Sequence, residues 1–353
     1  MSNQQPIKGF TSWKSPSNIA LVKYWGKFGN QMPKNASVSF TLDHAFTQTS
    51  IAYSSRPNAS DEISIHFLFE GQENPSFQKK IQVFLNSVLH EFPFLKELHL
   101  DIKSENSFPH STGIASSASS MSALALCLCQ MKREITGELL NEDDFLRNAS
   151  IIARLGSGSA CRSVFPYLGL WGELTQVENS SNEYAIPVYQ EVAPVFKTFR
   201  DSILIISATE KSVSSRAGHS LMEGNPYAEA RYQQANQHVI EILDAMRLGD
   251  LEKWGNIVEK EALTLHALMM ASEPPYILMH PNTLEVINKI RTFRQENNVP
   301  VYFTLDAGPN VHILYPHNVK DMVTHFIEEE LVYLCENGRV IHDNVGKGPR
   351  KIS

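Results

Sequence analysis

The sequence predicts an α+β protein built as two lobes, and three observations support this prediction. The chain has 353 residues, which is too long for one ordinary core and suits two domains or one large bilobed unit. Strand and helix patterns intermingle without the steady alternation that is typical of a doubly wound parallel sheet. Long amphipathic helices become frequent only in the second half. We therefore expect an N-terminal lobe at residues 1–190 and a C-terminal lobe at residues 191–353.

The first half is rich in strand patterns. Residues 36–53 alternate and contain many β-branched and aromatic side chains, which indicates strands. Asn141 precedes two acidic residues and is expected to be a helix N-cap. A polar tract at 179–184 is either a domain boundary or a hairpin. After the first strands we expect, in chain order, a strand at 63–69, a helix at 77–91, a strand at 98–103, and helices at 116–131 and 141–154.

The second half alternates long helices with short apolar strands. Its helices show the periodic apolar face that predicts packing against a sheet or against each other. We expect, in chain order, a strand at 202–207, helices at 227–247, 251–270 and 281–295, strands at 301–305 and 312–315, and a last helix at 319–331.

Composition disfavours several classes of protein. The net charge is −7, whereas a protein that binds nucleic acid usually has a basic surplus. No apolar run approaches the length of a membrane span, and the first residues lack the pattern of a signal peptide. The four cysteines do not form a C-x-x-C pair, so free thiols in a reducing cytoplasm are expected for Cys127, Cys129, Cys161 and Cys335.

Residues 108–120 read FPHSTGIASSASS and are expected to form a phosphate-binding loop that leads into a helix. Small side chains allow the backbone to approach a ligand closely, and the free N–H groups at a helix N-terminus attract anions. Gly113 permits a tight turn, and Ser116 and Ser117 offer hydroxyl groups to phosphate oxygens or to a magnesium shell. The alternative is a small-residue helix that packs tightly in a core.

Residues 17–27 read SNIALVKYWGK and place two lysines beside an aromatic pair. A lysine ammonium is a point-charge partner for phosphate, and Tyr24 adds a hydroxyl donor. By itself this segment is more typical of a solvated edge strand that carries Lys23 and Lys27.

Residues 154–163 read RLGSGSACRS and combine backbone donors, hydroxyl groups and two guanidinium groups. The planar fork of Arg162 suits a carboxylate. A flexible Gly/Ser linker is the alternative, but apolar residues flank the segment on both sides.

Residues 301–310 read VYFTLDAGPN, in which a β-rich run ends at Asp306 before a turn marked by Gly308 and Pro309. An acid at the end of a buried strand is well placed to be desolvated and to act as a base. The alternative is an aspartate that only caps the turn.

These four segments, in their order along the chain, resemble the motifs of the diphosphomevalonate decarboxylase family. The segment PHSTGIASSA is similar to the phosphate motif of the superfamily that contains galactokinase, homoserine kinase, mevalonate kinase and phosphomevalonate kinase, with Ile114 in place of the usual Leu. The resemblance covers residues 17–310. It implies a ribosomal protein S5 domain 2-like N-terminal lobe and a ferredoxin-like C-terminal lobe, with the active site in the cleft between them.

The resemblance also implies a set of site residues. Three of them are expected to be catalytic: Lys23, Arg162 and Asp306. Those expected to bind the substrate are Tyr24, Lys27, Ser157, Gly158, Ser159, Ser215 and Arg216. Those expected to bind ATP are Asn106, Pro109, Gly113, Ala115, Ser116 and Ser117. No protein side chain is assigned as a metal ligand, because Mg²⁺ is expected to arrive with ATP, with Ser117 as a possible additional contact.

Residues 211–219 read KSVSSRAGH and resemble the segment that contacts the diphosphate in bacterial members, with Lys211 near the Ser215–Arg216 pair. The sequence departs from the family pattern at His219, where Met is usual, and at His110, where Thr is common. A family contact from an arginine on the first helix has no clear match here, and the nearest candidates are Lys79 and Lys80.

The resemblance implies that the chain uses ATP and Mg²⁺ to decarboxylate mevalonate 5-diphosphate to isopentenyl diphosphate, and that it forms a homodimer in the cytoplasm. The alternatives are a decarboxylase of a mevalonate monophosphate, a kinase of the same superfamily such as a mevalonate 3-kinase or homoserine kinase, and an inactive ligand-binding relative. Nucleic-acid and membrane partners are not expected. A pure kinase would not need Arg162 and Asp306 together, which favours the decarboxylase.

Overall fold

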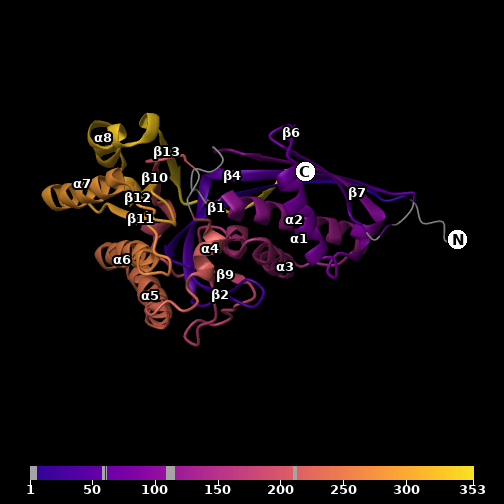
Figure 1. Ribbon diagram of the computed structural model, residues 1–353, viewed down its shortest axis with the longest axis horizontal. Helices are drawn as coiled ribbons and strands as arrows, with labels where there is room; N and C mark the ends of the chain where they lie inside the picture. The colour runs from indigo at the N-terminus through magenta and orange to yellow at the C-terminus, as the bar shows by residue number, and fades with distance from the viewer. Residues whose placement is uncertain (1–5, 58–59, 61, 109–115, 210–212) are drawn as a thin grey trace.

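The computed structural model describes residues 6–57, 60, 62–108, 116–209 and 213–353. It is a mixed α+β fold in two lobes, as the sequence predicts. In Figure 1, α7 and α8 lie at one end of the molecule, and α1 and β7 lie towards the other. Among the described residues, no helix is both long enough and apolar enough to cross a membrane.

The described strands form three sheets: one of eight strands, one of four and one of two. Their bounds are β1 Lys8–Val22, β2 Lys27–Phe28, β3 Met32–Pro33, β4 Ser37–Ser55, β5 Ser64–Phe69, β6 Gln72–Glu73, β7 Leu98–Asn106, β8 Leu168–Trp171, β9 Ala185–Pro187, β10 Arg200–Leu204, β11 Tyr302–Leu305, β12 Val311–Tyr315, β13 Val340–Asn344 and β14 Arg350–Lys351.

The described α-helices are α1 Pro75–Ser87, α2 Ser116–Thr136, α3 Glu142–Gly156, α4 Ser215–Ser220, α5 Ala228–Leu248, α6 Leu251–Met270, α7 Pro281–Asn297 and α8 Lys320–Glu330. Short 3₁₀ turns occupy Pro93–Glu97, Gly158–Val164, Pro194–Thr198, His317–Val319, Val332–Leu334 and Glu336–Gly338.

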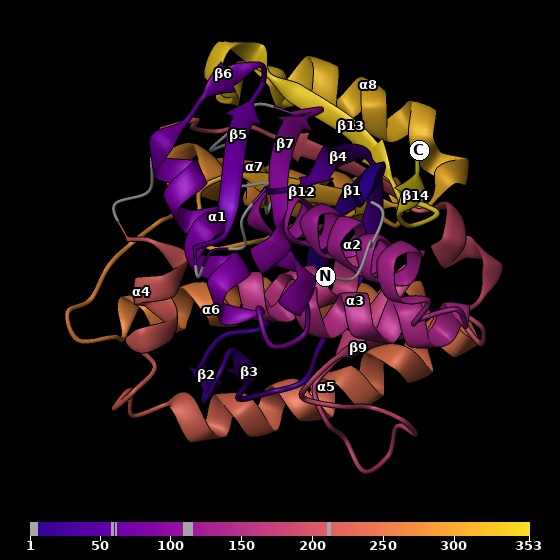
Figure 2. The same ribbon diagram turned by 90° about the vertical axis from the view of Figure 1, so that its right-hand side faces the viewer.

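Two long strands organise the first lobe. β1 and β4 pair antiparallel along most of their length, and the strand order of the main path is β14-β1-β4-β7-β5-β6. The early part of β4 pairs with β8, whereas its later part pairs with β7. The first hydrophobic core lies between this sheet and α1–α3, which Figure 2 shows beside β5 and β7. β1 therefore carries the chain from this core directly to Lys23.

The four-stranded sheet of the second lobe, in the order β11-β12-β10-β13, lies between two helical layers. Side chains of a strand point alternately to its two faces. Ile203 and Leu314 belong to the core that contains α5 and the start of α6. Their sequence neighbours Leu204 and Ile313 belong to the core that contains α7 and α8. The sheet thus fixes the position of the turn that carries Asp306, because this turn joins β11 to β12.

Most sequence expectations for single elements are confirmed. The helix at 251–270 has the predicted bounds, and Asn141 caps α3 by accepting hydrogen bonds from two backbone N–H groups. The expected strands within 36–53 are one continuous strand, β4. The polar tract at 179–184 connects β8 to β9, which pair antiparallel, so it lies in a hairpin connection. The elements that were not predicted from the sequence are the short helix α4 and the strands β1, β2, β3, β6, β8, β9, β13 and β14.

Candidate active site

A cavity of about 470 Å³ collects segments that are distant in the sequence. Its walls come from the residues after β1, the start of α2, the turn after α3, the short helix α4, the middle of α6 and the turn after β11. Eleven residues that the sequence assigned to a site line it: Lys23, Tyr24, Lys27, Ser116, Ser117, Ser157, Gly158, Ser159, Arg162, Ser215 and Asp306.

An ion pair lies in the wall of this cavity. Lys23 Nζ is 3.0 Å from Asp306 Oδ1, and the lysine side chain is 2% exposed while the aspartate side chain is 29% exposed. Burial lowers the pKa of Lys23 below its ordinary value of 10.5, and the charge of Asp306 opposes this shift. The lysine is therefore not on a solvated edge strand. Its buried cation holds the carboxylate of Asp306 at the cavity surface.

Arg162 is a second buried cation in the cavity. Its Nε and Nη1 donate to the hydroxyl groups of Ser39 and Ser37, each at 2.6 Å, and its guanidinium lies over the Trp171 ring. Burial lowers the pKa of Arg162, but a guanidinium stays protonated. No carboxylate among the described residues forms an ion pair with it. A buried cation without such a partner favours an anionic ligand.

The Gly/Ser turn that precedes Arg162 is closely packed against the aromatic wall. A Cβ at Gly158 would lie 2.9 Å from the Trp171 ring and 3.0 Å from the Tyr24 hydroxyl oxygen, so glycine is required for this approach. Ser157 Oγ is 3.2 Å from Ser117 Oγ at the start of α2. Hydrogen-bond donors of the Gly/Ser turn and of α2 therefore face the same part of the cavity.

The described part of the phosphate loop is its junction with α2. Ser116 and Ser117 open this 21-residue helix, whose first N–H groups are free to bind an anion. The expected ATP contacts Pro109, Gly113 and Ala115 lie outside the described residues, as does His110. Asn106 ends β7, where its Oδ1 accepts a hydrogen bond from Thr47 Oγ1 at 2.7 Å, and it does not line the cavity.

Three of the residues expected to bind the diphosphate, Tyr24, Lys27 and Ser215, line the cavity. Burial raises the pKa of Tyr24, so its hydroxyl remains a donor. Lys27 begins the β2–β3 hairpin, and its Nζ donates to Gln31 Oε1 at 3.0 Å. Ser215 begins α4 next to the N-cap Ser214. The side chain of Arg216 lies outside the described part of the structure, and so does Lys211.

His219 connects α4 to the segment that follows Lys23. Its ring packs on the rings of Tyr24 and Trp25, and its Nδ1 accepts a hydrogen bond from the Gly26 N–H at 3.0 Å. Burial lowers the pKa of His219 to about 3, so the ring is neutral at physiological pH and can accept this bond. The histidine thus has a packing role in the wall of the cavity, which it also lines.

The two candidates for the missing family arginine are not in the cavity. Lys79 and Lys80 are exposed on α1, and neither belongs to the lining. No cluster of three potential metal ligands occurs among the described residues. The sequence also did not identify several lining or supporting residues: Asn18, Trp25, Gln31, Glu261, Leu265, His266 and Ala307. Their roles depend on contacts between segments far apart in the chain, and no local pattern indicates them.

This geometry defines a two-lobed enzyme for a small anionic substrate. Hydrogen-bond donors that can bind phosphate and a buried cation lie around the same cavity. Two family models match the chain: the diphosphomevalonate decarboxylase-like N-terminal domain at residues 15–182 and the mevalonate 5-diphosphate decarboxylase C-terminal domain at residues 202–338. The diphosphomevalonate decarboxylase of Danio rerio is 31% identical over 89% of this chain and 77% of the relative. The chain therefore belongs to the diphosphomevalonate decarboxylase family.

Solved structures support the same assignment. The mevalonate diphosphate decarboxylase from Enterococcus faecalis is 26% identical, with a TM-score of 0.80 over 98% of this chain and 100% of that chain. A structure described as MDDEF in complex with MVAPP, AMPPCP and magnesium is 27% identical, with a TM-score of 0.80 and the same coverage.

Proposed function

We propose that the chain catalyses the ATP-dependent decarboxylation of mevalonate 5-diphosphate to isopentenyl diphosphate, with release of ADP, phosphate and CO₂. The observation that supports this proposal best is the combination of two features in one cavity. Asp306, held by Lys23, can accept a proton, and Arg162 is a buried cation that can bind a carboxylate. A kinase of a hydroxyl group would need only the first feature.

The protein groups have separate tasks in this reaction. Asp306 Oδ1 orients or accepts the proton of the tertiary 3-hydroxyl, because a carboxylate beside an ammonium group is kept ionised. Arg162 holds the substrate carboxylate so that the C–CO₂ bond aligns with the departing oxygen at C3. When the phosphorylated oxygen leaves, the electrons of the breaking C–CO₂ bond form the double bond of the product.

MgATP is the second substrate. The start of α2 fits its phosphates, because Ser116, Ser117 and the first N–H groups of the helix lie at the cavity beside the Gly/Ser turn. Its γ-phosphoryl group makes the 3-hydroxyl oxygen a good leaving group. We propose that Tyr24, Lys27 and Ser215, with Arg216, bind the substrate diphosphate. A monophosphate would leave part of this set without a ligand.

The test is to incubate the protein with MgATP and mevalonate diphosphate and to measure CO₂ and ADP in the same sample. Equal amounts of the two products support the proposal. ADP without CO₂ would instead identify a kinase, and neither product would identify an inactive ligand-binding protein. A parallel assay with the monophosphate should give a much lower kcat/KM, and equal rates would reassign the substrate.

We further propose that the protein works in the cytoplasm, forms a homodimer and divides into lobes at residues 1–190 and 191–353. The four cysteines are all free and buried, which fits a reducing compartment. Size-exclusion chromatography with light scattering tests the dimer, and limited proteolysis near residue 190 tests the boundary.

A further inference from the structure

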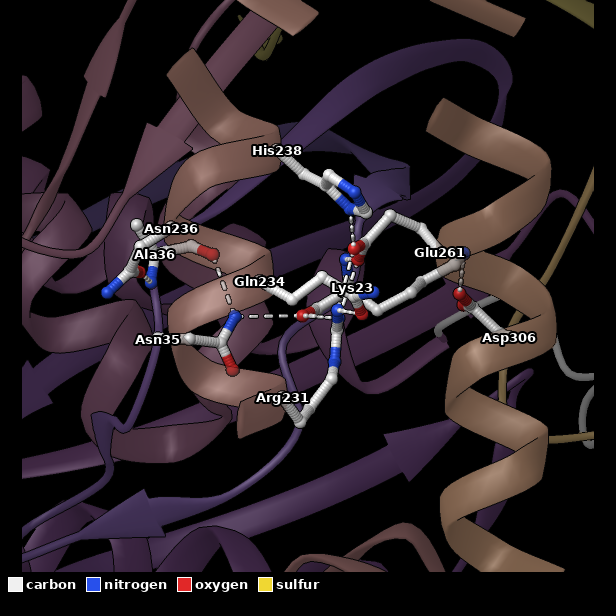
Figure 3. A network of polar contacts seen from close by, with 9 residues as sticks. All are labelled: Lys23, Asn35, Ala36, Arg231, Gln234, Asn236, His238, Glu261 and Asp306. Carbon is white, nitrogen blue, oxygen red and sulfur yellow. Dashed lines mark hydrogen bonds and ion pairs between the residues drawn. The ribbon is translucent and has the colours of Figure 1, made fainter. Parts of the chain in front are cut away.

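The backbone of Lys23 is held by side chains rather than by a neighbouring strand. β1 ends at Val22, and the Lys23 N–H donates to Glu261 Oε2 at 2.8 Å. The Lys23 carbonyl accepts from Asn35 Nδ2 at 2.9 Å and from Arg231 Nη2 at 3.2 Å. Figure 3 shows these contacts converging on Lys23 while its side chain extends to Asp306.

Glu261 is the centre of this network. Its two carboxylate oxygens accept from Arg231 Nη1 at 2.6 Å and Nη2 at 2.5 Å, and its Oε1 also accepts from His238 Nδ1 at 2.5 Å. Burial alone would raise the pKa of Glu261, but Arg231 and the hydrogen bond from His238 outweigh this and lower it to about 2. The carboxylate is therefore ionised and fixed at both oxygens, so it holds the Lys23 N–H rigidly.

The same helix also reaches the partner of Lys23. His266, five residues after Glu261 on α6, lies with its Nε2 3.1 Å from the Asp306 carbonyl oxygen. Because a carbonyl only accepts hydrogen bonds, His266 donates from Nε2. One rigid element therefore contacts the backbone of both members of the Lys23–Asp306 pair.

We propose that Glu261, together with Arg231, is a positioning residue that sets the place of Lys23 against Asp306 from the second lobe. This inference rests on the proposed function, because the pair matters only if Asp306 acts on the substrate hydroxyl. A shift of the Lys23 backbone moves its Nζ away from Oδ1, and misplacement of a reacting group by about 1 Å costs on the order of 100-fold in rate.

The charged groups that face the Lys23 ammonium come from three directions. Asp306 and Glu261 favour its charged form, whereas Arg162 disfavours it. Displacement of Nζ from Asp306, the largest influence that keeps Lys23 charged, should lower the pH at which Lys23 loses its proton. Glu261 and Arg231 carry opposite charges, so removing both together leaves the local charge balanced, and the alkaline limb of the rate profile then reports the position of Lys23. A purely structural role for Glu261 would move neither Nζ nor this limb.

The test variant is the double substitution Glu261→Leu with Arg231→Met. Removing both partners avoids an unpaired buried charge, and replacing a buried ion pair by apolar side chains is often neutral for stability. We expect kcat to fall about 10- to 100-fold. KM for mevalonate diphosphate should change little, and the alkaline limb of kcat should move to lower pH.

α6 offers a matched control. Glu259 is two residues before Glu261, is also buried, and accepts from Arg294 Nη1 at 2.5 Å, but this arginine also donates to the Val301 carbonyl and not to the Lys23 carbonyl. Glu259→Leu with Arg294→Met therefore removes the same kind of contact from the same helix. This control should keep the wild-type kcat per folded molecule and the wild-type pH profile.

The outcomes separate the positioning role from the proposed function. If wild type releases no CO₂, the proposed function fails. The inference is then judged from a crystal structure of the Glu261/Arg231 variant. A single Lys23 conformer with its 3.0 Å contact to Asp306 would overturn it, and several conformers would support it. If wild type is active, equal kcat values and pH profiles in the two double variants would also overturn the inference.

Discussion

At the residue scale, the proposed function divides the residues that line the cavity into groups that act at the reacting centre and groups that only bind the substrate. Asp306 is the only carboxylate among the described lining residues, and it is paired with Lys23. The serines and lysines on the other walls can form similar contacts with the substrate before and during the reaction. Substitutions at these two kinds of residue should therefore have different kinetic signatures.

Asp306→Asn should reduce kcat on the order of 100- to 10,000-fold, because an amide cannot accept the hydroxyl proton. The affinity for MgATP should stay near that of wild type, since the aspartate is assigned to the substrate hydroxyl and not to the phosphates. Turnover assays and calorimetric titration with MgATP measure the two effects. Near-wild-type turnover would remove Asp306 from the mechanism.

Arg162→Met and Arg216→Met should differ in which constant they change. Arg162 is assigned to the substrate carboxylate in the proposed function, so its loss should depress kcat on the order of 100-fold and alter substrate Kd much less. Arg216 is assigned to the diphosphate, so its loss should mainly raise Kd, and this effect should shrink for a monophosphate analogue. The roles are wrong if Arg216→Met harms both substrates equally or if Arg162→Met changes only Kd.

At the element scale, local signals predicted those parts of the fold that depend on nearby residues. Asn141 was identified as a cap because the residues that it bonds lie two and three positions ahead. β13 was missed because its pairing with β10 joins segments about 140 residues apart. The contact between Glu261 and the Lys23 N–H spans 238 positions, so the sequence could indicate Lys23 but not what holds it.

The acid stability of α6 gives a prediction at this scale. The pKa of Glu261 is about 2 when folded, against an ordinary value of 4.5, so its contribution is complete above about pH 4.5 and is lost as pH falls towards 2. This shift corresponds to about 3 kcal/mol. Denaturant unfolding should show wild type losing stability faster than Glu261→Leu with Arg231→Met between pH 5 and pH 2. Parallel loss in both proteins would contradict the assignment.

At the scale of the whole molecule, the cavity forms only if the two lobes keep a fixed position relative to each other. Arg162 and the Gly/Ser turn belong to the first half of the chain, and Asp306 belongs to the second. Several contacts away from the substrate help to join the halves. β14, near the C-terminal end, pairs with β1; one hydrophobic core contains residues of both halves; and Asp343 of β13 contacts the backbone of β4. The position of Asp306 therefore depends on contacts far from the substrate.

Asp343 is the most specific of these contacts. Its side chain is buried, and its carboxylate accepts from the N–H groups of Asp43, His44 and Ala45 at 3.0, 2.8 and 2.7 Å. Asp343→Asn keeps the shape but removes the charge and turns an NH₂ group towards backbone donors. We expect the free energy of unfolding to fall by about 2–3 kcal/mol, which is typical for hydrogen bonds to a charged group.

The kcat of Asp343→Asn shows whether Asp343 keeps the two lobes in their relative position or stabilises the fold only locally. If it holds β13 against β4, Asp343→Asn should also lower kcat modestly at temperatures where the protein is fully folded, because Asp306 is carried by the same sheet. Glu296→Gln, an exposed acid at the end of α7, is the control and should leave both stability and kcat unchanged. Urea denaturation and CO₂ release, measured on both variants, give the answer. A loss of stability with an unchanged kcat would limit Asp343 to a local role, and unchanged stability would show that the three N–H groups find other acceptors.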